Sequence, residues 1–195
     1  MPKLRISFAL LMSFAALAAA ASSFAQGRPD PAITIAAQKT AMAQLKFMDG
    51  IWRGPAWTVL PSGARHDVTQ TERIGPLLDG SLKLLEGRAY NADGTTGFNA
   101  LGVVSYDPKA KTFNLHSYAQ GMSGDFALVP TKDGYAWEIP LGPMTIRYTA
   151  TITDSTWHEV GDRIMGEQDP VRFFDMDLKR VSDSPWPGDG AVPPQ

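Results

Sequence analysis

The chain has 195 residues and a formal net charge of −2 at pH 7, with 18 Lys and Arg against 20 Asp and Glu. It contains no cysteine, which excludes disulfides, thiolate metal sites, cysteine nucleophiles and a lipid-modified N-terminal cysteine. The basic residues are scattered and outnumbered, so the composition also argues against nucleic-acid binding.

The first 25 residues have the pattern of a secretory signal peptide. Lys3 and Arg5 supply positive charge, an apolar run spans 6–21, and small residues precede Gln26. We therefore expect cleavage after Ala25 and a periplasmic or secreted protein without a membrane anchor. Residues 26–30 are expected to form a linker, 31–182 a single domain, and 183–195 a disordered tail rich in Pro and Gly.

The segment from Asp30 to about Gly50 is predicted to form a helix. Asp30 can accept hydrogen bonds from the first free backbone N–H groups, and Pro31 suits the first helical position. Apolar positions recur near one face of this segment: Ile35, Met42, Leu45 and Met48. Because the helix precedes the β segments instead of alternating with them, the pattern argues against a parallel α/β fold.

From Ile51 onward, nine groups of turn-forming residues recur at intervals of roughly 8 to 12 residues. They lie at 61–63, 79–80, 91–97, 107–108, 121–124, 132–134, 140–143, 153–155 and 161–170. The sequence therefore predicts an all-β protein with about ten strands joined as sequential hairpins. This pattern favours an up-and-down antiparallel β-barrel over a Greek-key sandwich, which stays open as the alternative.

The first predicted strand begins with Gly50-x-Trp52-x-Gly54. Glycines allow the backbone to bend and to approach its neighbours closely, while a Trp at this place can cover the floor of a closed barrel. We therefore expect Trp52 to close the barrel rather than to recognise a ligand, although it is also a candidate wall residue. A barrel of eight to ten strands is wide enough for about one small ligand.

Several segments carry a resemblance to a known family. They are 48–54, 71–80, 117–121, 137–140, 156–159 and 173–180. On these segments the stretch from about Leu45 to Val181 resembles the secreted bacterial calycin-like proteins grouped as domain of unknown function 1579. The resemblance implies a lipocalin-like or fatty-acid-binding-protein-like barrel, and it implies no activity.

The chain is more distantly similar to nitrobindin, a haem barrel that also opens with Gly-x-Trp-x-Gly. In that family a His on a late strand ligates the haem iron. The comparable segment here, 171–180, contains no His, and the three histidines are His66, His116 and His158. Haem binding is therefore not expected, and no other cofactor is predicted.

Motifs for catalysis and metal binding are incomplete. His158-Glu159 lacks the second His of a zinc-protease helix, and 121–125 departs from a nucleophile elbow at its last position. Asp175 and Asp177 alternate with apolar residues, so we expect both carboxylates to face solvent. The sequence predicts neither a catalytic residue nor a metal site.

Candidate ligand contacts are polar residues that share a strand face with apolar residues. By period-two alternation, Glu72 falls with Ile74, and Glu159 with Trp157. Glu86 and Arg88 fall with Leu82 and Leu84 of their strand. The predicted ligand-binding set is Glu72, Glu86, Arg88, Tyr118, Trp137, Tyr148, Trp157 and Glu159. The alternative is an Arg/Glu network or rim that holds no ligand.

Three functions stay open at this point. The first is an exported protein that binds a small, mostly apolar molecule inside the barrel. The second is an enzyme in which Glu72 or Glu159 acts as a general base with a pKa raised by burial. The third is a domain that binds or inhibits another envelope protein. The ligand and the oligomeric state are not predicted.

Overall fold

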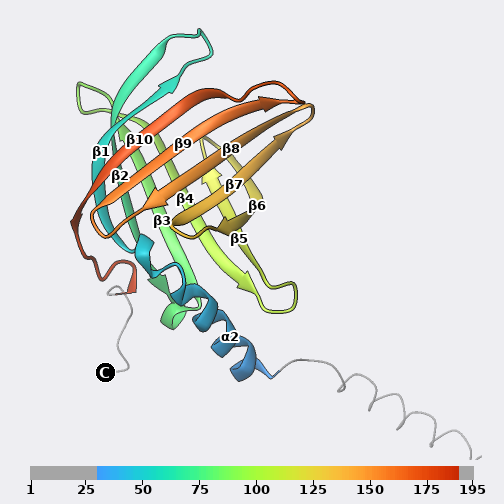
Figure 1. Cartoon of the computed structure of the whole chain (residues 1–195). Coiled ribbons are helices and arrows are strands. Elements are labelled where there is room, and N and C mark those ends of the chain that lie inside the picture. Colours follow the sequence, from blue (N-terminus) through green and yellow to red (C-terminus); the bar gives the residue numbers. More distant parts are fainter. Residues whose placement is uncertain (1–29, 189–195) are drawn as a thin grey trace, which may run out of the picture. The chain divides into compact units, whose positions relative to one another are not determined.

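The computed structural model describes residues 30–188 (Figure 1). The predicted signal peptide with its cleavage site, most of the predicted linker, and 189–195 lie outside the described residues. Within 30–188, no helix combines the length and the apolar character that crossing a membrane requires.

Helix α2 spans Pro31–Ala43 and is followed by the 3-10 helix η1, Lys46–Met48. The backbone N–H of Ala32 donates to Asp30 Oδ1 at 2.9 Å, which is the predicted N-terminal cap. The α-helix ends earlier than predicted, because the chain turns at 44–45 and tightens into η1. This turn places Leu45 and Met48 in fully buried positions.

Ten strands form a closed antiparallel barrel within the described residues, and each strand pairs with its chain neighbours while β1 pairs with β10. The strands are β1 (Gly50–Val59), β2 (Arg65–Leu77), β3 (Leu82–Tyr90), β4 (Thr96–Asp107), β5 (Thr112–Ala119), β6 (Met122–Pro130), β7 (Gly134–Leu141), β8 (Met144–Ile152), β9 (Thr156–Met165) and β10 (Val171–Ser182). A short 3-10 helix, η2 (Leu78–Gly80), joins β2 to β3. The predicted up-and-down barrel with one preceding helix is confirmed, and the strand order excludes the Greek-key alternative.

One end of the barrel is closed by η1 and by large side chains at the start of β1. Trp52 is fully buried, and its Nε1 donates to the carbonyl oxygen of Met48 at 2.9 Å. Its ring meets the ring of Trp157 edge to face, with centroids 5.8 Å apart. Trp52 therefore lies at the barrel floor, the place that the glycine-flanked motif predicts.

The second glycine of that motif allows the seam between β1 and β10 to close. A Cβ atom on Gly54 would lie 2.0 Å from the carbonyl oxygen of Asp177, far inside van der Waals contact. Gly50 has a φ of 130°, which residues with a Cβ rarely adopt. Both glycines are therefore required by the backbone path.

The other end of the barrel is less covered. Four inward-facing positions near it are exposed: Phe98 (37%), Met122 (72%), Leu141 (48%) and Met165 (43%). Strands β6 and β7 pair only from Leu128↔Trp137 to Pro130↔Tyr135, so their segments nearest this end do not pair with each other. We call this the open end; it exposes apolar side chains that face the barrel interior.

Candidate functional site

The barrel interior contains a cavity of about 130 Å³, lined by residues of β2 to β7 and of β9. Its polar lining includes Glu72, Ser117, Tyr135 and Glu159, and its aromatic lining includes Phe98, Trp137 and Trp157. Phe98 belongs to the open end, whereas Trp157 contacts the floor residue Trp52. The cavity therefore occupies the space between the closed floor and the open end.

Glu159 projects inward from β9 and is buried, with 7% of its surface exposed. Its Oε2 accepts a hydrogen bond from the hydroxyl of Tyr135 at 2.5 Å. Burial raises the pKa of Glu159, while the nearby donors of Tyr135, Trp137 and Trp157 oppose that rise. Burial, together with the negative charge of Glu159, raises the pKa of Tyr135 well above its usual value, so the phenol keeps its proton and acts as the donor.

Glu72 projects inward from β2, and its Oε1 accepts a hydrogen bond from Gln70 Nε2 at 2.6 Å. Burial raises the pKa of Glu72 to about 8, the Gln70 hydrogen bond lowers it, and the charges of Glu159 and Glu86 raise it further. On β3, Gly87 pairs with Glu72, and a Cβ there would lie 2.6 Å from Oε1. The glycine thus leaves the space that the carboxyl group occupies.

Trp157 places an indole N–H donor beside these carboxyl groups. Its Nε1 is buried and is close enough to Glu159 to lower the pKa of that group, but it makes no hydrogen bond of ordinary geometry within the described part of the chain. Buried polar groups in native proteins almost always have a partner, whether protein, water or ligand. Because Trp157 lines the cavity, this donor is available to an acceptor atom placed there.

Stacked aromatic rings continue from the cavity across β7 and β8. The rings of Trp137 and Tyr148 are nearly parallel, with centroids 4.5 Å apart. Phe126 contacts the other side of this group, with its centroid 5.3 Å from that of Trp137. Tyr148 faces the barrel interior and stacks on Trp137, but only Trp137 of these two residues lines the cavity.

The structure brings together five of the sequence-predicted site residues inside the barrel: Glu72, Trp137, Tyr148, Trp157 and Glu159. Tyr135 and Gln70 complete the site and were missed by the sequence analysis. Tyr135 alternates with Trp137 on β7 and so shares its inward face, which is the signal that identifies it. Gln70 likewise shares the face of Glu72.

The predicted inward orientation of Glu86 and Arg88 is wrong. The register pairs Gly87 with Glu72, so Gly87 faces inward and its two neighbours face outward. The alternation suggested the wrong face because Leu82 and Leu84 occupy outer positions of β3, whereas Lys83 occupies an inner position. Lys83 is only 2% exposed and forms an ion pair with Asp49 at the closed end.

Tyr118 also faces outward, with 49% of its surface exposed. On β5 the inner positions are Phe113, Leu115 and Ser117, and these pair with inner positions of β4 and β6. Tyr118 contacts His116 on the outer face instead, with ring centroids 4.6 Å apart. It therefore does not line the interior cavity.

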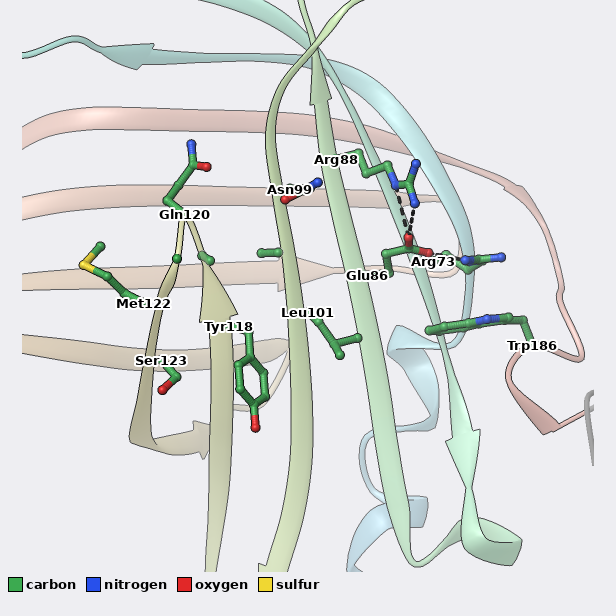
Figure 2. Close-up of a pocket in the computed structure, with 13 residues that line it drawn as sticks. Arg73, Glu86, Arg88, Asn99, Leu101, Tyr118, Gln120, Met122, Ser123 and Trp186 are labelled. Atoms are coloured by element: carbon green, nitrogen blue, oxygen red, sulfur yellow. Dashed lines mark hydrogen bonds and ion pairs between the residues drawn. The ribbon is translucent and has the colours of Figure 1, made fainter.

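Glu86, Arg88 and Tyr118 instead line an open groove of about 610 Å³ on the outer face of the barrel (Figure 2). Glu86 accepts hydrogen bonds from Arg73 and from Arg88, the latter at 2.6 Å between Oε1 and Nη2. Arg73 lies over the ring of Trp186, which follows β10, at 4.3 Å from its centroid. Glu86 thus forms ion pairs with Arg73 and Arg88 in this groove, whereas the interior carboxyl groups form none within the described residues.

A group of potential metal ligands lies on the outer face of β9 and β10. Atoms of His158, Asp175 and Asp177 lie within 4.8 Å of one another. Asp175 is already engaged, since His158 Nε2 lies 3.2 Å and Arg172 Nη1 3.5 Å from its oxygens. We interpret the group as a surface ion-pair network on the face that the sequence predicts to be outward.

Comparison with known proteins supports the fold alone. Neither a protein-family model nor a curated protein matches the sequence. A solved structure does match: the crystal structure of Rv2717c from M. tuberculosis has a TM-score of 0.54 to this chain and 12% sequence identity. The match covers 72% of this chain and 96% of that one. At this identity the similarity establishes a shared barrel architecture.

Proposed function

We propose that this protein is an exported calycin-like barrel that binds a small molecule in its interior. The observation that carries the proposal is the cavity itself, which combines the buried carboxyl group of Glu159 and the half-buried one of Glu72 with an aromatic wall and the indole N–H of Trp157. Binding sites for small molecules commonly join a mostly apolar lining to a few placed polar groups. Export is supported by the charged and apolar pattern of residues 1–25 and by the resemblance to secreted calycin-like proteins.

The cavity volume limits the ligand. About 130 Å³ is well below the roughly 300–1,000 Å³ of pockets that hold drug-sized molecules. A ligand enclosed in this space has only a few non-hydrogen atoms, and a longer apolar part would extend past Phe98 toward the open end. The polar end of such a ligand lies at Glu72 and Glu159.

Native mass spectrometry tests this proposal directly. Protein purified without denaturation is expected to carry a small molecule that solvent extraction releases, or to gain thermal stability from members of a broad ligand panel. The variant Ser117→Leu fills the cavity with an apolar side chain and is expected to lose that molecule or that gain. Ser123→Leu is the matched control, because Ser123 lies on the outer face.

Unchanged binding in Ser117→Leu would place the ligand outside the barrel. The absence of both a co-purified molecule and any thermal shift across the panel would refute interior binding.

A second candidate function is acid–base catalysis on the bound molecule. It is favoured by the position of Glu72 in the cavity wall, where burial raises its pKa to about 8 and lets this group exchange a proton near neutral pH. Incubation of the extracted molecule with the protein, followed by mass spectrometry, tests it. Conversion by the wild-type protein and not by Glu72→Gln supports catalysis, whereas recovery of the unchanged molecule from both supports binding alone.

A further inference from the structure

The interior and outer glutamates of this barrel have opposite partners. On the outer face, Glu86 contacts Arg73 and Arg88, and Glu138 lies 2.6 Å from Arg147. In the interior, the neighbours of Glu72 and Glu159 are neutral donors: Gln70 at Glu72, and Tyr135 with the indoles of Trp137 and Trp157 at Glu159. Across residues 30–188, neither interior carboxyl group takes part in an ion pair.

The interior cations are engaged elsewhere. Lys83 is bound by Asp49 at the closed end. Arg163 lies over the ring of Phe173, 4.7 Å from its centroid, on the part of β9 that runs toward the open end. Glu159 and the half-buried Glu72 can therefore be ionised together only at a cost, because burial of a charge is unfavourable unless an opposite charge accompanies it; without a cation such groups keep a proton.

We propose that the interior site binds a small organic ammonium ion whose N–H groups donate to the carboxylates of Glu72 and Glu159. This inference rests on the proposed binding of a ligand inside the barrel and specifies the charge of that ligand. The bound ammonium supplies the missing positive charge, and each N–H donor gains a charge-assisted hydrogen bond. An anionic ligand would bring no charge that favours ionisation of these two carboxyl groups.

The aromatic wall favours an organic cation over a metal ion. Indole faces attract cations, and this protein already uses that contact where the guanidinium of Arg180 lies 4.4 Å from the ring centroid of Trp52. Magnesium and calcium need about six or more oxygen ligands, whereas the cavity offers two carboxyl groups, two hydroxyl groups and apolar walls. A volume of about 130 Å³, roughly four waters at about 30 Å³ each, accommodates an alkylammonium of a few carbon atoms.

Binding of such a cation is linked to proton release. Glu72, whose pKa is about 8, holds a proton in the empty barrel at neutral pH and has to lose it to pair with an ammonium ion. Protons therefore compete with the ligand, and the affinity rises as the pH increases from 6 to 8. We expect a gain of roughly tenfold or more over this interval. The alkylammonium itself stays charged throughout, since amines of this kind titrate near about pH 10.4.

A titration of protein carrying ¹³C at the glutamate carboxyl carbons tests the inference. The probes are propylammonium chloride, 1-propanol and sodium propionate, which are similar in size and differ in charge. We expect propylammonium to shift the resonances of Glu72 and Glu159 in a saturable manner, with 1-propanol at least tenfold weaker. Assignment uses Glu72→Gln and Glu159→Gln, each of which removes one resonance.

Variants separate this inference from a general effect of charge. Glu72→Gln is expected to weaken propylammonium binding at least tenfold, while Glu138→Gln on the outer face leaves it unchanged. Should the interior variants fail to fold, the increase in affinity between pH 6 and pH 8 in the wild-type protein still tests the requirement for ionised carboxyl groups.

Two results would overturn different parts of the proposal, the charge of the ligand or interior binding itself. If 1-propanol or propionate binds as tightly as propylammonium and shifts the Trp157 Nε1–H resonance, the ligand charge is wrong and interior binding stands. If no probe perturbs the interior resonances and the purified protein carries no small molecule, interior binding itself fails, and this inference fails with it.

Discussion

At the scale of single residues, the same side chain takes two roles depending on the strand face. Outward-facing Glu86 is shared by two arginines, and these contacts lower its pKa although burial alone would raise it. Inward-facing Glu72 meets Gln70 and an apolar surrounding, and its pKa rises. A shift of one position along a strand therefore decides whether a glutamate forms ion pairs on the outer face or lines the cavity.

Tyr135 is the residue whose removal isolates one contact of the site. Tyr135→Phe deletes the hydroxyl group that donates to Glu159 and leaves a buried acceptor without its donor. Because the indoles of Trp137 and Trp157 remain beside this acceptor, we expect the free energy of unfolding to fall by about 1 kcal/mol and the pKa of Glu159 to rise further. Urea unfolding monitored by tryptophan fluorescence measures the first effect, and carboxyl ¹³C titration measures the second.

Tyr118→Phe is the matched control for this prediction. The same hydroxyl group is deleted there from an exposed side chain on the outer face, so the expected change is within about 0.5 kcal/mol. Equal effects of the two substitutions would show that the contact between Tyr135 and Glu159 contributes nothing beyond a surface hydroxyl.

At the scale of elements, alternation predicted strand faces well where apolar residues fill the inner positions. On β8 the inner Ile146, Tyr148, Ala150 and Ile152 alternate with polar residues, and the structure has the same pattern. On β3 alternation failed, because the inner face carries Lys83 and Gly87 beside Leu85, while Leu82 and Leu84 lie on the outer face. Lys83 is inside because Asp49 at the barrel floor pairs with it, a contact between residues far apart in the chain that no local pattern contains.

Turn residues were the more reliable guide to the elements. Glycine, proline and asparagine mark chain reversals whatever the burial of the flanking strands, so they predicted the number of strands and their sequential pairing. The end of the helix was harder to predict. Leu45 and Met48 continue the apolar pattern of α2, yet they reach the barrel floor through a turn and η1, which only the packing against β1 requires.

The closure of β1 on β10 requires a glycine at position 54. Gly54→Ala places a Cβ 2.0 Å from Asp177 O and 2.9 Å from Leu178 Cα, and both atoms belong to the backbone of β10. Because neither can move without opening the seam, we expect the substitution to destabilise the fold by at least about 3 kcal/mol. Thermal unfolding followed by circular dichroism, with the soluble fraction after expression, measures this loss.

Gly102→Ala is the control substitution for the seam. Its added Cβ would lie 3.0 Å from Leu115 Cδ1, the end of a flexible side chain that can turn away. The expected cost is below about 1.5 kcal/mol. If Gly54→Ala proved as mild as Gly102→Ala, the close approach of β1 to β10 would not require a glycine.

At the scale of the whole barrel, the interior carboxyl groups connect stability to pH. Glu72 titrates near its ordinary value of 4.5 in the unfolded chain and at about 8 in the fold, and the pKa of Glu159 shifts in the same direction. Between these values the folded protein binds more protons than the unfolded chain does. The contribution of these two groups to the free energy of unfolding is therefore fully present below about pH 4.5, and it is lost as the pH rises through 8.

Urea unfolding at pH 5.5, 7.0 and 8.5 and constant ionic strength measures this dependence. We expect the free energy of unfolding of the wild-type protein to fall across the series by an amount on the order of a few kcal/mol. Glu72→Gln removes the titrating group while keeping its size, so its stability is expected to vary less over the same interval. Glu138→Gln, on the outer face beside Arg147, is expected to keep the wild-type slope.

Groups whose pKa is lowered on folding change the free energy of unfolding with the opposite sign, and they do so at lower pH. The pKa of Glu86 is lowered by its arginine partners, so its contribution is present above about pH 4.5 and is lost only at lower pH. When the pH dependence of the free energy of unfolding is compared between the wild-type protein and Glu72→Gln, the contributions of groups common to both proteins cancel. A wild-type stability that is flat or rising between pH 5.5 and pH 8.5, with the same profile in Glu72→Gln, would mean that the interior carboxyl groups are ionised in the empty barrel. The coupling of ligand affinity to proton release would then be lost as well.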